Sequence, residues 1–116
     1  MKLTDLRDRA RATLAREVGF VRKPHAERIR VALAFPNTYH VGMSNLGFQT
    51  LYRLFNAEPD VVCERVFLPP RPEIVEHFAS RVPLITIESQ TPVRDFDVLA
   101  LSVSFEWDYP NVVALL

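Results

Sequence analysis

The clearest hydrophobic pattern in the chain is a short apolar run followed by a helical repeat. Residues 29–35 are apolar except for Arg30 and rich in branched side chains, which is typical of a strand buried on both faces of a parallel sheet. Pro36 ends the run because proline has no N–H for the strand ladder. Apolar residues then recur at helical spacing over residues 44–56, with Ser44 as the expected N-cap. The pattern predicts a strand, a polar loop and a helix, the first half of a doubly wound sheet.

The rest of the chain continues this alternation of strands and helices. It predicts a basic amphipathic helix before the first strand, strands at 61–68 and 96–105, a helix at 72–82, a short strand or edge segment at 84–87, and a helix from about Pro110. We therefore expect an α/β fold, a Rossmann-like three-layer sandwich with a mainly parallel sheet and the strand at 96–105 in its centre. Because about four strands are visible and the chain stops inside a helical pattern, we expect an incomplete domain, a fragment of something longer.

The length of 116 residues indicates one domain. We divide it into residues 1–27, a basic helix with its linker, and residues 28–116, an α/β domain incomplete at its C-terminus. Although the net charge is zero, residues 1–30 carry nine Lys or Arg and four Asp or Glu. We interpret this basic arm as a solvated helix face or an intramolecular partner of the acidic remainder, and RNA binding stays open as an alternative.

The sequence also argues against several classes of protein and indicates a cellular compartment. No apolar run approaches the roughly 18 residues of a membrane span, and the single cysteine fits a reducing compartment, so we expect a cytoplasmic protein. The chain has no P-loop, no G-x-G-x-x-G and no G-x-S-x-G motif. Cys63 and the three histidines lack zinc-site spacing, so we expect Cys63 to be a buried thiol and His77 a surface residue.

The loop after the first strand is the densest group of potential ligands. It precedes a helix, whose free N–H groups favour anions, and its glycine would let a ligand approach the backbone. An ordinary turn whose polar side chains cap its own backbone explains the same composition. A second polar segment, residues 102–108, follows the strand at 96–105, and in a doubly wound sheet it would lie beside the first loop. The convergence of the two segments favours a binding site.

Three phrases of the sequence carry a family resemblance: GMSNLG at 42–47, ESQTP at 88–92 and DFDVLALSVSFE at 95–106. Over residues 28–116 the chain resembles the N-terminal region of radical S-adenosylmethionine (SAM) proteins that contain a cobalamin-binding domain, most closely an uncharacterised bacterial branch that begins with a basic helix. The resemblance implies a cobalamin-binding-like domain. It also implies a partner, normally in the same chain: a barrel with a 4Fe-4S cluster on C-x-x-x-C-x-x-C and bound SAM. One cysteine cannot supply that motif, so we expect no catalytic residue here.

The first loop departs from the cobalamin motif of such domains. Where D-x-H-x-x-G would supply a histidine to cobalt, this chain has Asn37, Tyr39 and Gly42, and only the glycine is retained. Tyrosine is a poor cobalt ligand at neutral pH, so we expect bound cobalamin without histidine coordination. The cofactor-binding residues that the resemblance implies are Asn37, Tyr39, His40, Gly42, Ser44, Ser102 and Ser104.

Two functions are compatible with these residues and with the resemblance. The first is an N-terminal cobalamin-binding-like domain of a radical SAM enzyme, not catalytic on its own. The alternative is a non-catalytic interaction or assembly domain that has lost cofactor binding. A phosphoreceiver domain is excluded because residues 35–37, Phe-Pro-Asn, supply no acidic pair.

Overall fold

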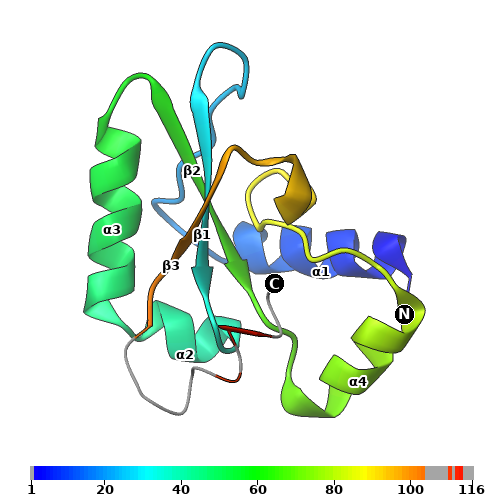
Figure 1. The fold of residues 1–116 in the computed structure, drawn as a ribbon. Coiled ribbons are helices and arrows are strands. Elements are labelled where there is room, and N and C mark those ends of the chain that lie inside the picture. Colours follow the sequence, from blue (N-terminus) through cyan, green and yellow to red (C-terminus); the bar gives the residue numbers. More distant parts are fainter. Residues whose placement is uncertain (1, 104–109, 111, 114–116) are drawn as a thin grey trace.

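The centre of the molecule is a sheet of three parallel strands. The computed structural model describes residues 2–103, 110, 112 and 113. In this part of the chain, β1 (Ile29–Phe35) lies between β2 (Val61–Phe67) and β3 (Val98–Leu101) (Figure 1). The pairing of β1 with β2 runs in register from Ile29 opposite Val61 to Phe35 opposite Phe67. The expected α/β fold with a parallel sheet is thus confirmed.

Helices lie on both sides of this sheet and at its carboxyl edge. They are α1 (Leu3–Ala15), α2 (Tyr39–Met43), α3 (Leu46–Ala57), α4 (Arg71–Ser80) and the 3₁₀ helix η1 (Val93–Asp95). In Figure 1, α3 and α1 lie on opposite sides of the strands, while α2 lies where β1 ends. No helix among the described residues has the length and apolarity that crossing a membrane would require.

The hydrophobic core forms where α3 packs against the sheet. Val31, Leu33 and Phe35 alternate along β1 and so share one face, and Phe48 and Tyr52 of α3 meet them there. The rings of Phe35 and Phe48 are 5.5 Å apart at an interplanar angle of 84°, an edge-to-face contact. This packing fixes α3, and with it the loop that leads from β1 into the helix.

The structure corrects one sequence prediction about strands and decides between two alternatives for another. The strand expected at the centre of the sheet is β3, and among the described residues β3 pairs only with β1, so β1 is the central strand. For 84–87 the edge segment, not the short strand, is confirmed, since it forms only an isolated antiparallel bridge between Ile85 and Pro92. This segment instead follows the outer edge of β2, where the Ile87 N–H donates to the Arg65 carbonyl at 2.9 Å.

The basic helix exists but buries less than its pattern predicts. Only Ala10 and Leu14 of α1 are buried, and Val18 lies beyond the helix in solvent. Gly19 has φ of 91°, a left-handed conformation that suits glycine, but it lies beyond the end of the helix, since α1 ends at Ala15 with Arg16 as its C-cap. The division of the chain at residues 27 and 28 stays a prediction.

Candidate functional site

The loop after β1 contains a short helix that its composition did not predict. The N–H of Gly42 donates to the Thr38 carbonyl at 3.0 Å and closes a turn, forming α2. Ser44 ends this helix, and its hydroxyl donates to the His40 carbonyl at 2.7 Å. The predicted N-cap Ser44 is therefore wrong. Asn45 caps α3 instead, because its Oδ1 accepts from the Phe48 N–H at 2.9 Å.

Tyr39 is anchored to the segment that follows α1. Its hydroxyl donates to the Glu17 carboxylate, and its ring meets Phe67 edge-to-face at 5.3 Å. Burial and the hydrogen bond to Glu17 raise the pKa of Tyr39 to about 12, so the phenol is protonated at neutral pH. A neutral phenol already donating to a carboxylate is not a suitable cobalt ligand.

Gly42 is required by packing rather than by ligand access. A Cβ at this position would lie 2.4 Å from Cε1 of Phe67 and 3.2 Å from Cβ of Phe35. The space that the missing side chain leaves is therefore filled by the protein's own core.

The other predicted site residues have different surroundings. Asn37 uses its Oδ1 to accept from the Thr38 N–H at 2.8 Å, and its carbonyl accepts from the Leu68 N–H at 2.9 Å. His40 is exposed, beside the Tyr39 ring. Ser102 is half-buried, and its N–H donates to the Ala34 carbonyl at 2.9 Å, so its segment does lie beside the end of β1. Ser104 lies outside the described residues.

These observations test whether cobalamin fits the predicted site. The glycine that would let the cofactor approach is packed under Phe67, and the tyrosine in the ligand position is bound to Glu17. The residues present do not fit a cobalamin that enters this loop. Among the predicted site residues of this loop, His40 and Ser44 are exposed.

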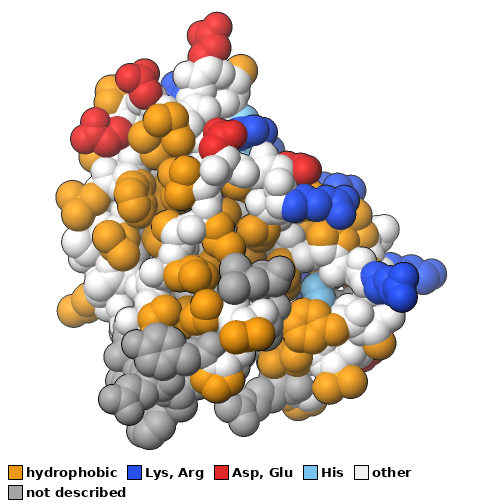
Figure 2. Space-filling view, viewed as in Figure 1, with side chains coloured by type: hydrophobic (Ala, Val, Ile, Leu, Met, Phe, Trp, Pro, Cys, Tyr) orange, Lys and Arg blue, Asp and Glu red, His pale blue; other side chains and the backbone are white. Residues whose placement is uncertain are grey.

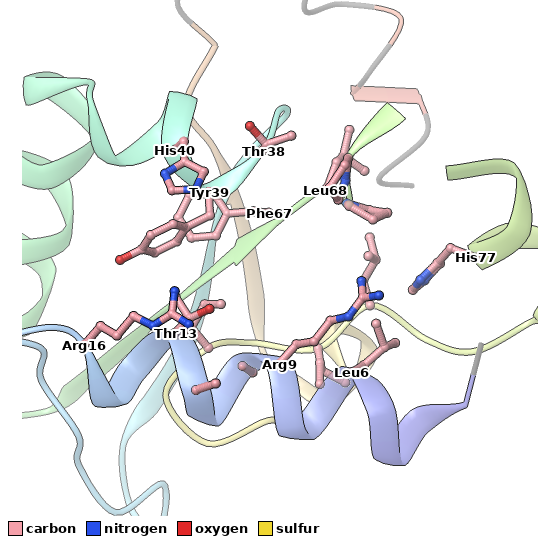
Figure 3. A pocket seen from close by; sticks show the side chains of 17 residues that line it. Leu6, Arg9, Thr13, Arg16, Thr38, Tyr39, His40, Phe67, Leu68 and His77 are labelled. Atoms are coloured by element: carbon pink, nitrogen blue, oxygen red, sulfur yellow. The ribbon is translucent and has the colours of Figure 1, made fainter. Parts of the chain in front are cut away.

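A cavity opens beside this loop, between α1 and the carboxyl end of β2. Its volume is about 400 Å³, which is within the range of small-molecule sites. Figure 3 shows Tyr39 and His40 on one side of it, Arg9, Thr13 and Arg16 of α1 on the other, and His77 of α4 at one end. The expected surface position of His77 is wrong: its exposed fraction is 1%.

Sequence reasoning also missed a buried group of charged residues on β2. Arg65 has an exposed fraction of 1%, and its Nε donates to Glu88 at 2.7 Å while its Nη1 donates to Glu17 at 2.9 Å. Its guanidinium lies 4.6 Å from the centre of the Tyr52 ring. Burial is the largest single effect and lowers the pKa of Arg65. Glu88, Tyr52 and Glu17 together raise this pKa more, so the net shift is upward and the guanidinium stays charged. Glu88 of the ESQTP segment therefore stabilises the fold by pairing with Arg65.

Glu64, the neighbour of Arg65, points to the opposite face of the sheet and is also buried. It accepts hydrogen bonds from Thr86 and Ser89 at 2.6 Å and lies 2.7 Å from Nε2 of His25. The signal in the sequence was two adjacent charges inside an otherwise apolar strand. Such a pair requires a counter-group on each face.

Residues 47–116, more than half of the chain, match the model of a protein family described as radical SAM proteins, N-terminal. The chain belongs to this family. No curated protein and no solved structure matches it. Membership implies SAM and a 4Fe-4S cluster in the catalytic region, and association of this radical SAM N-terminal domain with that region.

The residues of this chain do not fit the cluster itself. The sequence has one cysteine, Cys63, which is fully buried, as expected. Burial, with a smaller effect of Glu88, raises the pKa of its thiol to about 12, so the thiolate that binds iron is disfavoured. Among the described residues, no group of three or more His, Cys, Asp or Glu side chains could hold a metal ion.

Proposed function

We propose that this chain is the non-catalytic N-terminal domain of a radical SAM enzyme and that it docks against the catalytic region of that enzyme. The observation that carries the proposal is the family match over residues 47–116 in a chain whose only cysteine is buried. The cluster that cleaves SAM must then be supplied by another part of the enzyme. This domain contributes to the reaction by contact with that part.

A surface suited to such contact lies over α3 and β3. Figure 2 shows hydrophobic side chains gathered on this side of the molecule. Leu54 of α3 is 61% exposed, and Val98 of β3, on the face of the sheet that α3 covers, is 45% exposed. We call the exposed apolar residues of α3 together with Val98 the α3–β3 surface. Apolar residues collected in this way are typical of a protein–protein contact.

The docking surface can be tested by binding to a separately produced catalytic region of the same family. Leu54→Arg and Val98→Arg would place a charge in the contact, and we expect each to weaken the complex at least about tenfold. The matched control is Val75→Arg, since Val75 is 77% exposed on α4, away from this surface. Equal binding by all three variants would contradict the assignment of the surface, and the absence of any complex would contradict docking itself.

Cobalamin binding is the second candidate. It is favoured by the position of Ser102 beside the end of β1 and by the exposed His40 in the loop after β1, because ligands of doubly wound sheets bind beyond the carboxyl ends of the strands. The filled space at Gly42 argues against it.

Hydroxocobalamin retained after gel filtration, measured by its absorbance, separates the two candidates. We expect no retention if the domain only docks. If cobalamin is retained, paramagnetic resonance of the reduced cob(II)alamin form reports its ligand. Nitrogen splitting that disappears in His40→Ala would show histidine coordination, contrary to the expectation from the sequence.

A further inference from the structure

The cavity between α1 and β2 has walls of two kinds. Phe67, Leu68 and Ile85 give it an apolar floor, and α1 contributes the guanidinium groups of Arg9 and Arg16. The described residues that line it include no aspartate and no glutamate. The cavity is therefore both apolar and cationic, which suits an organic anion with an apolar body.

The two arginines differ in their availability. Arg9 forms an ion pair with Glu73 of α4. Arg16 lies two helical turns further along the same side of α1 and forms no ion pair with any described residue. Arg16 is thus the cation that an anionic group can reach without displacing a carboxylate.

His77 supplies the second observation that points to a ligand. Its side chain is nearly fully buried, and neither Nδ1 nor Nε2 forms a hydrogen bond of normal geometry in the described part of the chain, although the Val82 backbone lies near enough to raise its pKa. Buried polar atoms are almost always paired, so this imidazole lacks a group that the cavity has room to admit. Burial lowers the pKa of His77, against a weaker opposing effect of the Val82 backbone, so the ring is neutral and offers one donor and one acceptor.

Figure 3 shows how these groups are arranged. Arg16 lies at one end of the cavity, with Thr13 near it, and His77 extends from α4 at the other end. The Phe67 and Leu68 side chains lie between the two ends. The polar groups are thus separated by an apolar stretch rather than gathered at one point.

We propose that this cavity binds a small, elongated organic anion. Its carboxylate or phosphate group accepts hydrogen bonds from Arg16, its aromatic or aliphatic body packs on Phe67 and Leu68, and a neutral hydroxyl or N–H group at its far end pairs with His77. A corrinoid is much larger than the cavity, so the proposed ligand is not cobalamin, although Tyr39 and His40 of the predicted cobalamin site also line the cavity. The cavity uses no residue of the α3–β3 surface, so either proposal can fail without the other.

The probe for the test is 6-(p-toluidino)naphthalene-2-sulfonate, an elongated aromatic anion with its sulfonate and its N–H at opposite ends of the naphthalene, whose fluorescence rises in an apolar site. N-(p-tolyl)-2-naphthylamine has the same rings without the sulfonate and serves as the neutral comparison. We expect one saturable site for the anion on the complete 116-residue chain, with the neutral dye bound at least about tenfold more weakly. Equal affinity for the two dyes would overturn the anion site.

Substitutions assign the dye to the cavity. Arg16→Gln should weaken binding of the anion about tenfold and leave the neutral dye unchanged. The matched control is Arg94→Gln, because Arg94 lines a different hollow that His77 also borders. A loss of anion binding in Arg94→Gln, with none in Arg16→Gln, would overturn the assignment.

The role of His77 is tested by a pair of variants. His77→Phe keeps a ring of similar size without hydrogen-bonding atoms, and His77→Gln keeps a donor and an acceptor. We expect the phenylalanine variant to bind the anion several-fold more weakly than the glutamine variant, since the toluidino N–H at the far end of the dye needs an acceptor. Equal binding by the two variants, both with the melting temperature of the parent, would contradict the hydrogen bond to His77.

Discussion

At the scale of single residues, Tyr39 links the loop after β1 to the acidic residue that follows α1. Its pKa is raised from 10.0 to about 12 in the folded protein. The folded state therefore favours the protonated phenol. This contribution to stability is complete below the unfolded pKa and is lost as the pH rises through about 12.

We expect Tyr39→Phe to lower the free energy of unfolding at neutral pH by about 1 kcal/mol, the usual contribution of one hydrogen bond. The variant should also lack the part of the alkaline loss of stability that arises from Tyr39. Urea unfolding at a series of pH values from about 9 to about 12 measures both effects. If the free energy of unfolding changes with pH in the same way for the parent and the variant, the hydrogen bond to Glu17 does not shift the pKa of Tyr39.

The packing around Gly42 predicts that a larger residue is not tolerated there, because Phe67 fills the space where a side chain would begin. Gly42→Ala should destabilise the protein by about 1–3 kcal/mol through overpacking, measured by thermal or urea unfolding. Gly47→Ala is the matched control in the next helix, where a Cβ would meet only the Asn45 side chain, at 3.2 Å. If the two variants are equally stable, the loop moves to accept the methyl group and the space at Gly42 is adaptable.

At the scale of elements, the segment after α1 completes a buried ion pair. The narrow apolar stripe of the basic helix, taken alone, predicts that residues 1–23 are dispensable for the fold and that their deletion costs less stability than Leu33→Ala. The structure changes this expectation, because Glu17 binds the buried Arg65 and the Val21 N–H donates to the Tyr52 hydroxyl at 2.8 Å. Removing residues 1–23 would remove both interactions.

We expect Glu17→Gln to lower the free energy of unfolding by about 1–3 kcal/mol, because Arg65 would keep only one carboxylate partner. Asp8→Asn is the control: Asp8 lies on the exposed side of α1, 3.8 Å from Arg11, and such surface pairs contribute little. Unfolding followed by circular dichroism measures both variants. A neutral Glu17→Gln would restore the view that the N-terminal arm is separable from the core.

The elements that the sequence predicted well are those with strong local patterns. The strand at 29–35 and the helix that packs on it were found because apolar residues recur at strand or helix spacing within the segment itself. The helix α2 was missed because it has five residues and a glycine inside a polar loop. A pattern of such short range cannot distinguish one turn of helix from an irregular turn.

The buried polar residues were missed for a different reason. His77 reads as a surface residue among charged neighbours, and its burial depends on segments distant in the sequence. Arg65 interrupts an apolar strand, and its partners are contributed by residues 17 and 88. These pairings depend on tertiary structure, which periodicity along the chain does not report. The assignment of residues 37–44 and 102–104 to a cofactor stays a prediction.

At the scale of the whole molecule, the chain should depend on another part of the enzyme for all cluster chemistry. Anaerobic reconstitution of the isolated chain with iron and sulfide should give no stable 4Fe-4S absorbance and no SAM cleavage, since one buried thiol cannot replace three ligands. Cys63→Ser should behave in the same way as the parent. A cluster that forms on the monomeric parent, and not on this variant, would contradict the division of functions.

The outer edges of the two outer strands, β2 and β3, differ in their hydrogen bonding. Along β2, the backbone N–H of Arg65 donates to the Glu88 carboxylate at 2.9 Å and its carbonyl accepts from Ile87, so residues 84–92 close this edge. Along β3, no described strand pairs with the outer edge. Open edges accept further strands, and closed edges do not. The sheet can therefore grow in one direction only, and any strand that joins it, from the same polypeptide or another, must add beside β3.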